Sequence, residues 1–175
     1  SNGKIDACFH GKRKKRKMIL NSSLSAFEID SAFNIVNYKK NNLDFSINLT
    51  REDMLSDELR SYLWACVHEY TVQKRLILEI VESEGIKDID AISEFLTKAK
   101  NCGCRLAIDE FWTGYSNFEY LIKLDATYIK IDGSIIKNIH KEDGAMDVVK
   151  AIVTFAQARG MKTVAEFVSS KEIFD

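Results

Sequence analysis

The chain has 175 residues, of which 46% are hydrophobic and 29% are charged, and its formal net charge is −1. This length supports one domain with a substantial core, and the composition excludes a disordered chain. The near-neutral charge gives no general attraction to nucleic acid or membranes. No apolar run approaches the roughly 18 residues that cross a bilayer. Residues 1–17 are basic and lack the apolar stretch of a signal peptide.

The first recognisable features are a basic run and a helix. Lys12 to Lys17 reads KRKKRK, and six like charges repel one another, which favours an exposed loop over a phosphate contact. The following segment, Ser25 to Lys39, places apolar residues at the spacing of a buried helical face. These residues are Ile29, Ala32, Phe33 and Val36.

From Asn41 onward, short β-rich runs alternate with amphipathic helical runs. In chain order they are a strand Asp44 to Thr50, a helix Ser56 to Tyr70 with Ser56 as N-cap, a strand Arg75 to Glu82, a helix Asp88 to Asn101 that stops at Gly103, a strand Arg105 to Phe111, a short helix Asn117 to Lys123, a strand Thr127 to Asp132, a helix Asp143 to Arg159 that ends at Gly160, and a strand Lys162 to Val168. This alternation predicts βαβ units with a parallel sheet, either doubly wound or closed as a barrel. No GxGxxG or Walker-type turn follows a strand, which counts against a nucleotide-binding doubly wound fold.

Four cysteines are present, and two of them form the sequence Cys102-Gly103-Cys104. This pair lacks the second pair and the nearby histidine that a typical metal site would have. We interpret the cysteines as reduced thiols, which makes the cytoplasm the expected location.

Polar residues recur at the C-terminal end of each predicted strand, where a βα barrel builds its site. They are Asn48, Glu79 with Glu82, Asp109 with Glu110, Lys130 with Asp132, and Glu166. Carboxylate and amide oxygens without His or Cys suit hard cations such as Mg²⁺, Mn²⁺ or Ca²⁺. A lysine among them can orient a water or neutralise a phosphate. The pattern therefore points to metal-assisted attack on a phosphodiester.

Each of these residues also has a purely structural explanation. Asn48 can cap a strand end, and Asp109 with Glu110 can cap the following turn. Glu79 and Lys130 fit this explanation less well, because each is a charge inside an otherwise apolar strand. A polar residue stands near the C-terminal end of all five predicted strands, and this recurrence favours a functional site.

Four segments resemble the signature motifs of EAL domains, in the same order and with the spacing intact. The family's DDFGTGYSS and LKID motifs correspond to IDEFWTGYSN and, downstream, YIKID. The family's asparagine-bearing strand corresponds to SINLT, and its ExxE strand to LEIVES. The AEGVET motif corresponds to TVAEFVSS. The likeness covers residues 25–175. It implies a TIM-like (β/α) barrel of the EAL type that is incomplete, with the first strand and the C-terminal closing elements missing or altered. A complete barrel typically has about 250 residues.

The resemblance implies a hydrolase that linearises cyclic di-GMP with two divalent cations, Mg²⁺ or Mn²⁺. Carried over by position, the metal ligands are Asn48, Glu79, Asp109 and Glu110, the catalytic residues are Lys130, Glu166 and Glu82, and the substrate contacts are Arg13 and Trp112. In these roles Lys130 positions the attacking water and Glu82 helps to hold the loop after the DDFGTG-like strand. Glu110 keeps the charge of the motif's second aspartate but carries it one methylene further out.

The departures from the family pattern lie at the expected site. No EAL motif is present, and the best placement puts Phe9 at the metal-binding glutamate and Arg13 on the family's arginine. Alternatively, this segment is unrelated and the first strands lie outside the chain. Trp112 replaces a glycine of DDFGTG, and Phe167 and Ser169 replace the glycine and the second glutamate of AEGVET. The changes in these three motifs would cost at least about 4 kcal/mol of transition-state stabilisation.

We expect residues 1–23 to form a divergent N-terminal segment and residues 24–175 to form the EAL-type barrel. Three functions are compatible with the sequence: a degenerate EAL domain that binds cyclic di-GMP or a protein partner, an active phosphodiesterase that forms linear pGpG, and a ligand-free scaffold. Enzymatic activity is left open, with an inactive domain favoured. The expected partners are cyclic di-GMP and a protein partner or an upstream sensor or GGDEF-type domain. We expect neither nucleic acid nor a membrane segment, and we leave a dimer open.

Overall fold

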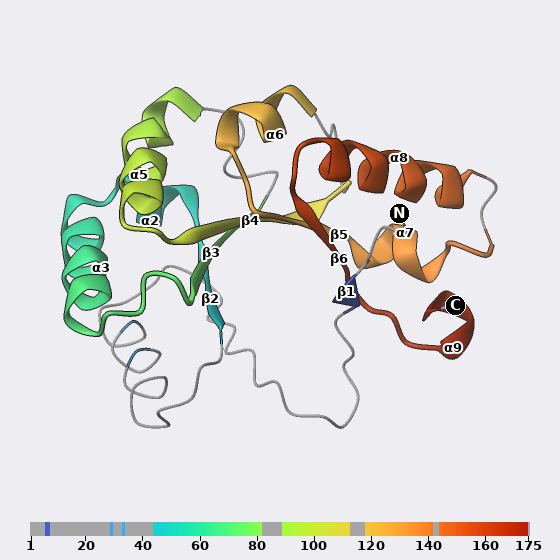
Figure 1. Ribbon diagram of the computed structural model, residues 1–175, viewed down its shortest axis with the longest axis horizontal. Helices are drawn as coiled ribbons and strands as arrows, with labels where there is room; N and C mark the ends of the chain where they lie inside the picture. Colours follow the sequence, from blue (N-terminus) through green and yellow to red (C-terminus); the bar gives the residue numbers. More distant parts are fainter. Residues whose placement is uncertain are drawn as a thin grey trace. The chain divides into compact units, whose positions relative to one another are not determined.

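The structure is a computed structural model that describes residues 6–7, 29, 33, 44–81, 89–112, 118–141 and 144–174. The chain divides into two compact units, one made of Ser1–Lys14 with Ala107–Asp175 and the other of Lys15–Leu106. Figure 1 shows the helices and strands of both units. No helix in these described ranges is long and apolar enough to cross a membrane.

The described residues of the Lys15–Leu106 unit include two parallel strands and three helices. The strands are β2 (Phe45–Leu49) and β3 (Leu76–Val81), and the helices are α2 (Arg51–Leu55), α3 (Asp57–Glu69) and α5 (Ile89–Asn101). Leu76, Leu78 and Ile80 of β3 are at most 1% exposed, and Ile77 and Val81 are partly buried. Such burial is expected for a parallel strand that is covered on both faces. Phe33 packs its ring 5.5 Å from the rings of Phe45 and Tyr70 and so contributes to this core.

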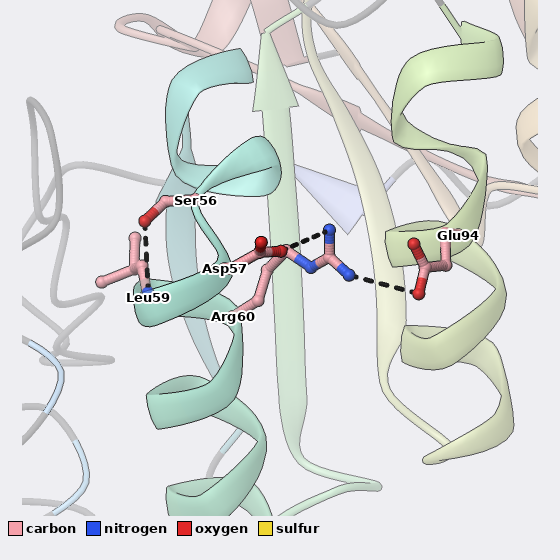
Figure 2. Close-up of polar contacts among 5 residues, drawn as sticks. All are labelled: Ser56, Asp57, Leu59, Arg60 and Glu94. Carbon is pink, nitrogen blue, oxygen red and sulfur yellow. Dashed lines mark hydrogen bonds and ion pairs between the residues drawn. The ribbon is translucent and has the colours of Figure 1, made fainter.

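Local hydrogen bonds explain where the helices of this unit begin. Thr50 and Asp53 form a capping box for α2, in which each side chain accepts a hydrogen bond from the other residue's backbone N–H. At the start of α3, the Ser56 hydroxyl accepts a hydrogen bond from the Leu59 N–H (Figure 2). Figure 2 also shows α3 beside α5. The Arg60 guanidinium on α3 forms an ion pair with the Glu94 carboxylate on α5, with an N–O distance of 3.3 Å. Since the Glu94 carboxylate is largely exposed, this ion pair contributes little stability.

The second unit contains parallel strands in the order β1, β6, β5 and β4. Their bounds are β1 (Asp6–Ala7), β6 (Lys162–Ala165), β5 (Tyr128–Ile131) and β4 (Arg105–Phe111), which enters this unit at Ala107. The helices are α6 (Phe118–Leu124), α7 (Gly133–Lys137), α8 (Ala145–Ala158) and α9 (Lys171–Phe174). Phe118 packs against both Phe111 of β4 and Phe155 of α8, with ring centroids 5.6 and 4.8 Å apart. These apolar contacts fix the helices against the strands that carry the site.

The five predicted strands and the four helices predicted after residue 41 are all found, with shifts of a few residues at their ends. The last strand stops at Ala165 and not at Val168, because the backbone of Phe167 has a φ of +52° and cannot continue a strand. Of the helix predicted over 25–39, Ile29 and Phe33 are described, and both are helical and buried. The remainder of that helix and the basic run Lys12 to Lys17 lie outside the described residues.

Candidate active site

A β-bulge at the end of β4 sets the directions of two carboxylates. Between β4 and β5, Ile108 pairs with Ile129 while Phe111 pairs with Ile131, so β4 contains one extra residue. Glu110 sits in this bulge with a φ of +53°, and its N–H donates to Asp109 Oδ1 at 2.9 Å. As a result Asp109 is buried and Glu110 is exposed.

Lys130, at the C-terminal end of β5, is held between two carboxylates. Its Nζ forms ion pairs with Asp109 Oδ2 and, at 2.9 Å, with Glu166 Oε1. Glu166 follows the last residue of β6, and its backbone N–H donates to the carbonyl of Ile131 at 3.2 Å. Because only 6% of Lys130 is exposed, its charge requires such partners. We refer to Asp109, Lys130 and Glu166 as the Lys130 cluster.

Two further carboxylates add negative charge around the Lys130 cluster. The pKa of Glu110 is raised, first by its partial burial and then by the charges of Asp109, Asp132 and Glu166, while Lys130 lowers it. Asp132 also caps α7, since its Oδ1 accepts from the Ser134 N–H at 2.7 Å. Four carboxylates therefore act around one ammonium, and this excess of negative charge favours cations.

The Lys15–Leu106 unit carries the other two predicted metal ligands side by side. Asn48 and Glu79 are direct partners in the parallel register of β2 and β3, so their backbones are about 4.8 Å apart. Glu79 is only 4% exposed, although it carries a carboxylate. One amide and one carboxylate oxygen on adjacent strands fit part of the oxygen shell of a Mg²⁺ or Mn²⁺ ion. Asp109 and Glu110, the remaining predicted ligands, belong to the other unit.

The two aromatic residues that follow the acidic strand ends have backbone conformations that favour glycine. The φ angle is +95° at Trp112 and +52° at Phe167, and these are the positions at which the EAL motifs have glycine. A left-handed conformation costs an ordinary L-residue about 1–2 kcal/mol. Both side chains are also exposed, Trp112 by 38% and Phe167 by 53%. The backbone path of a glycine is thus kept at both positions while a large ring is added.

The predicted site residues divide into three groups in the structure. Asp109, Glu110, Lys130 and Glu166 interact within one unit, which also contains Trp112, and Asn48 and Glu79 are neighbours within the other. Glu82, Arg13 and Phe9 lie outside the described residues, so their predicted roles stay predictions. Among the described residues, no group of three or more His, Cys, Asp or Glu side chains is arranged to hold a metal ion.

The sequence analysis missed the residues of α7 that contact Phe167. Gly133 begins this helix and Lys137 ends it, and the Lys137 Nζ lies 4.1 Å from the centroid of the Phe167 ring. The only available signal was the glycine directly after the strand-end residue Asp132, which did not by itself indicate a contact with a loop 34 residues later.

Comparisons with known proteins agree on the family of the chain. The EAL domain family matches residues 16–175. The cyclic di-GMP phosphodiesterase PdeA of Borreliella burgdorferi is 30% identical over 130 residues, which are 74% of this chain and 19% of that protein, so the chain spans about a fifth of this relative.

Two solved structures give the same fold assignment. The PaMucR phosphodiesterase in complex with c-di-GMP superposes with a TM-score of 0.77 and 28% identity, covering 85% of this chain and 66% of that one. The EAL domain of Mycobacterium smegmatis DcpA gives a TM-score of 0.68 and 30% identity, covering 75% and 60%. The predicted EAL-type (β/α) fold is thereby confirmed, and the chain belongs to the EAL domain family.

Proposed function

We propose that this domain binds cyclic di-GMP together with a divalent cation and hydrolyses the nucleotide inefficiently, so that it acts mainly by binding. The observation that carries the proposal is the Lys130 cluster, in which Glu166 directly precedes Phe167 and Asp109 lies three residues before Trp112. Both aromatic residues are exposed and have glycine-type backbone conformations. The charged side chains Asp109, Lys130 and Glu166 of the EAL motifs are kept here, while residues next to them are changed.

A divalent cation is needed in this proposal because the site is rich in carboxylates. Cyclic di-GMP carries two phosphate charges, which the carboxylates around Lys130 would repel in the absence of a cation. The oxygens of Asn48 and Glu79, which are register partners in β2 and β3, suit such a Mg²⁺ or Mn²⁺ ion. When bound, such a cation neutralises phosphate charge and activates a water for attack. PdeA of Borreliella burgdorferi and PaMucR are both named as phosphodiesterases, and PaMucR is solved with c-di-GMP, which supports this ligand.

The chain's own residues have separable roles in this proposal. Lys130 holds Asp109 and Glu166 in place through its two ion pairs. Trp112, at the end of β4, offers an exposed indole on which a guanine base can stack.

The same residues explain why turnover is expected to be slow. Hydrolysis needs the reacting groups within a fraction of an ångström of their productive positions, and binding tolerates more. Trp112 and Phe167 place bulky, strained residues directly after the strand ends that carry the acidic groups. The predicted alignment of Phe9 with the motif glutamate would act in the same direction, because an apolar ring cannot bind a cation.

The second candidate function is an efficient cyclic di-GMP phosphodiesterase. The specific observation that favours it is that the Lys130 cluster is complete, with both ion pairs formed.

Titration calorimetry of the full chain with cyclic di-GMP, with and without Mn²⁺, tests the proposal. The expected result is binding that requires Mn²⁺, is lost in Glu79→Ala, and is kept in the control Asp57→Asn, which alters an exposed carboxylate of the same unit. Chromatography of the same samples should show mostly cyclic nucleotide. Rapid formation of linear product that Glu79→Ala abolishes would support the second candidate instead. Absence of binding heat under all conditions would overturn both.

A further inference from the structure

The ring of Phe167 packs on α7 although the residue is more than half exposed. A Cβ added to Gly133 would overlap the Phe167 ring at Cδ2 and would lie 2.9 Å from its Cγ, so the ring occupies the space that a side chain at position 133 would fill. One helical turn later, the Lys137 ammonium lies 4.1 Å from the ring centroid, within the range of a cation–π interaction. We call this arrangement the Phe167 contact.

The Phe167 contact offsets two unfavourable features of the residue. Phe167 has a left-handed backbone, with a φ of +52°, and an exposed apolar side chain. A packed ring face and a cation–π interaction supply stabilisation of the same order. The contact therefore holds the chain in a turn immediately after β6, where neither strand nor helix begins again until Lys171.

Glu166 lies between this turn and the end of β6. Its backbone N–H bonds to Ile131 on one side, and its neighbour Phe167 is fixed on α7 on the other. Its carboxylate is only partly buried, yet it reaches Lys130 Nζ at 2.9 Å. The hydrogen bond to Ile131 and the packing of Phe167 fix the backbone on both sides of the Glu166 side chain. The Glu166 carboxylate therefore loses less conformational entropy when it forms the ion pair with Lys130.

We infer that Phe167 is a positioning residue whose ring, held by Gly133 and Lys137 of α7, directs the Glu166 carboxylate onto Lys130. This inference rests on the proposed function for its effect on cyclic di-GMP binding, but not for its effect on the ion pair. It assigns a role to an aromatic side chain at a position where the family motif has glycine.

The first test observes the ion pair without any nucleotide. The signal of the Lys130 ammonium in ¹H–¹⁵N NMR reports how fast its protons exchange with water, and a buried, paired ammonium exchanges slowly. We expect Phe167→Gly to accelerate this exchange to the rate seen in Glu166→Gln, and Phe167→Tyr to keep the slow rate. Phe167→Gly relieves the left-handed backbone, so loss of the fold is not expected. The matched control is Phe174→Ala, which removes a comparably exposed phenylalanine of the same unit. An unchanged Lys130 signal in Phe167→Gly overturns the inference.

The second test is a double-mutant cycle on cyclic di-GMP affinity with Mn²⁺. Loss of a positioning contact typically weakens such a site by about 10-fold or more. We expect Phe167→Gly to weaken binding by this factor in the parent and by much less in a Glu166→Gln background, because its effect passes through Glu166. Equal losses in both backgrounds overturn the positioning role. If the parent binds no nucleotide, the proposed function fails, while the ammonium exchange still decides the inference.

Discussion

The packing of Phe167 on Gly133 predicts a specific coupling in stability. In Gly133→Ala the new methyl group overlaps the Phe167 ring, and overpacking of this kind costs about 1–3 kcal/mol. Alanine offsets part of this cost, since it is favoured over glycine in a helix by about 1 kcal/mol. We therefore expect Gly133→Ala to lower the free energy of unfolding by up to about 2 kcal/mol in the parent. In a Phe167→Gly background the overlap is gone, and the same change should be neutral or stabilising by about 0.4–1 kcal/mol.

Urea unfolding of the parent, both single variants and the double variant measures this coupling. Gly160→Ala serves as control, because its φ of +72° makes the substitution unfavourable while no atom lies near the added Cβ. It should cost about 1–2 kcal/mol in both backgrounds. Additive effects of Gly133→Ala and Phe167→Gly would refute the packing argument.

Three further predictions concern buried or coupled groups. Lys130→Met leaves Asp109 and Glu166 without their shared ammonium, and unfolding in urea at pH 7 should show a loss of about 3 kcal/mol or more. Because the pKa of Glu110 is raised on folding, its ionisation opposes folding as pH rises, so Glu110→Gln should raise the urea midpoint at neutral pH but not near about pH 3, where the carboxyl is protonated in both states. Burial, and then the neighbouring cysteine, raise the pKa of Cys104 to about 12, so iodoacetamide at about pH 8 should modify this thiol far more slowly in folded than in urea-unfolded protein.

The sequence was sufficient to predict the Lys130 cluster because of a general property of parallel strands. Their C-terminal ends lie at one edge of the sheet, so polar residues at the same offset in β4, β5 and β6 must come close together. Asp109, Lys130 and Glu166 meet this condition, and the structure joins them by two ion pairs. Asn48 and Glu79 also lie near the C-terminal ends of their strands, and the structure makes them register partners.

Other features could not be predicted from local patterns. The bulge at Glu110 was missed because IDEF is compatible with a regular strand, and only the register against β5 reveals the extra residue. Helices α2 and α7 have five residues each, too few for an apolar periodicity, although the T-x-x-D sequence at Thr50 is a capping signal for α2. The Phe167 contact depends on a backbone turn and on a partner distant in sequence, so no spacing rule indicates it.

A single-turnover assay tests the central claim most directly. The full chain, in excess over labelled cyclic di-GMP and with Mn²⁺ present, is sampled over time and the nucleotides are separated by chromatography, with Glu79→Ala as control. The account predicts that the nucleotide is bound by the parent and recovered almost entirely in its cyclic form. Rapid conversion to linear pGpG by the parent, absent in Glu79→Ala, would contradict it and identify the domain as an efficient phosphodiesterase.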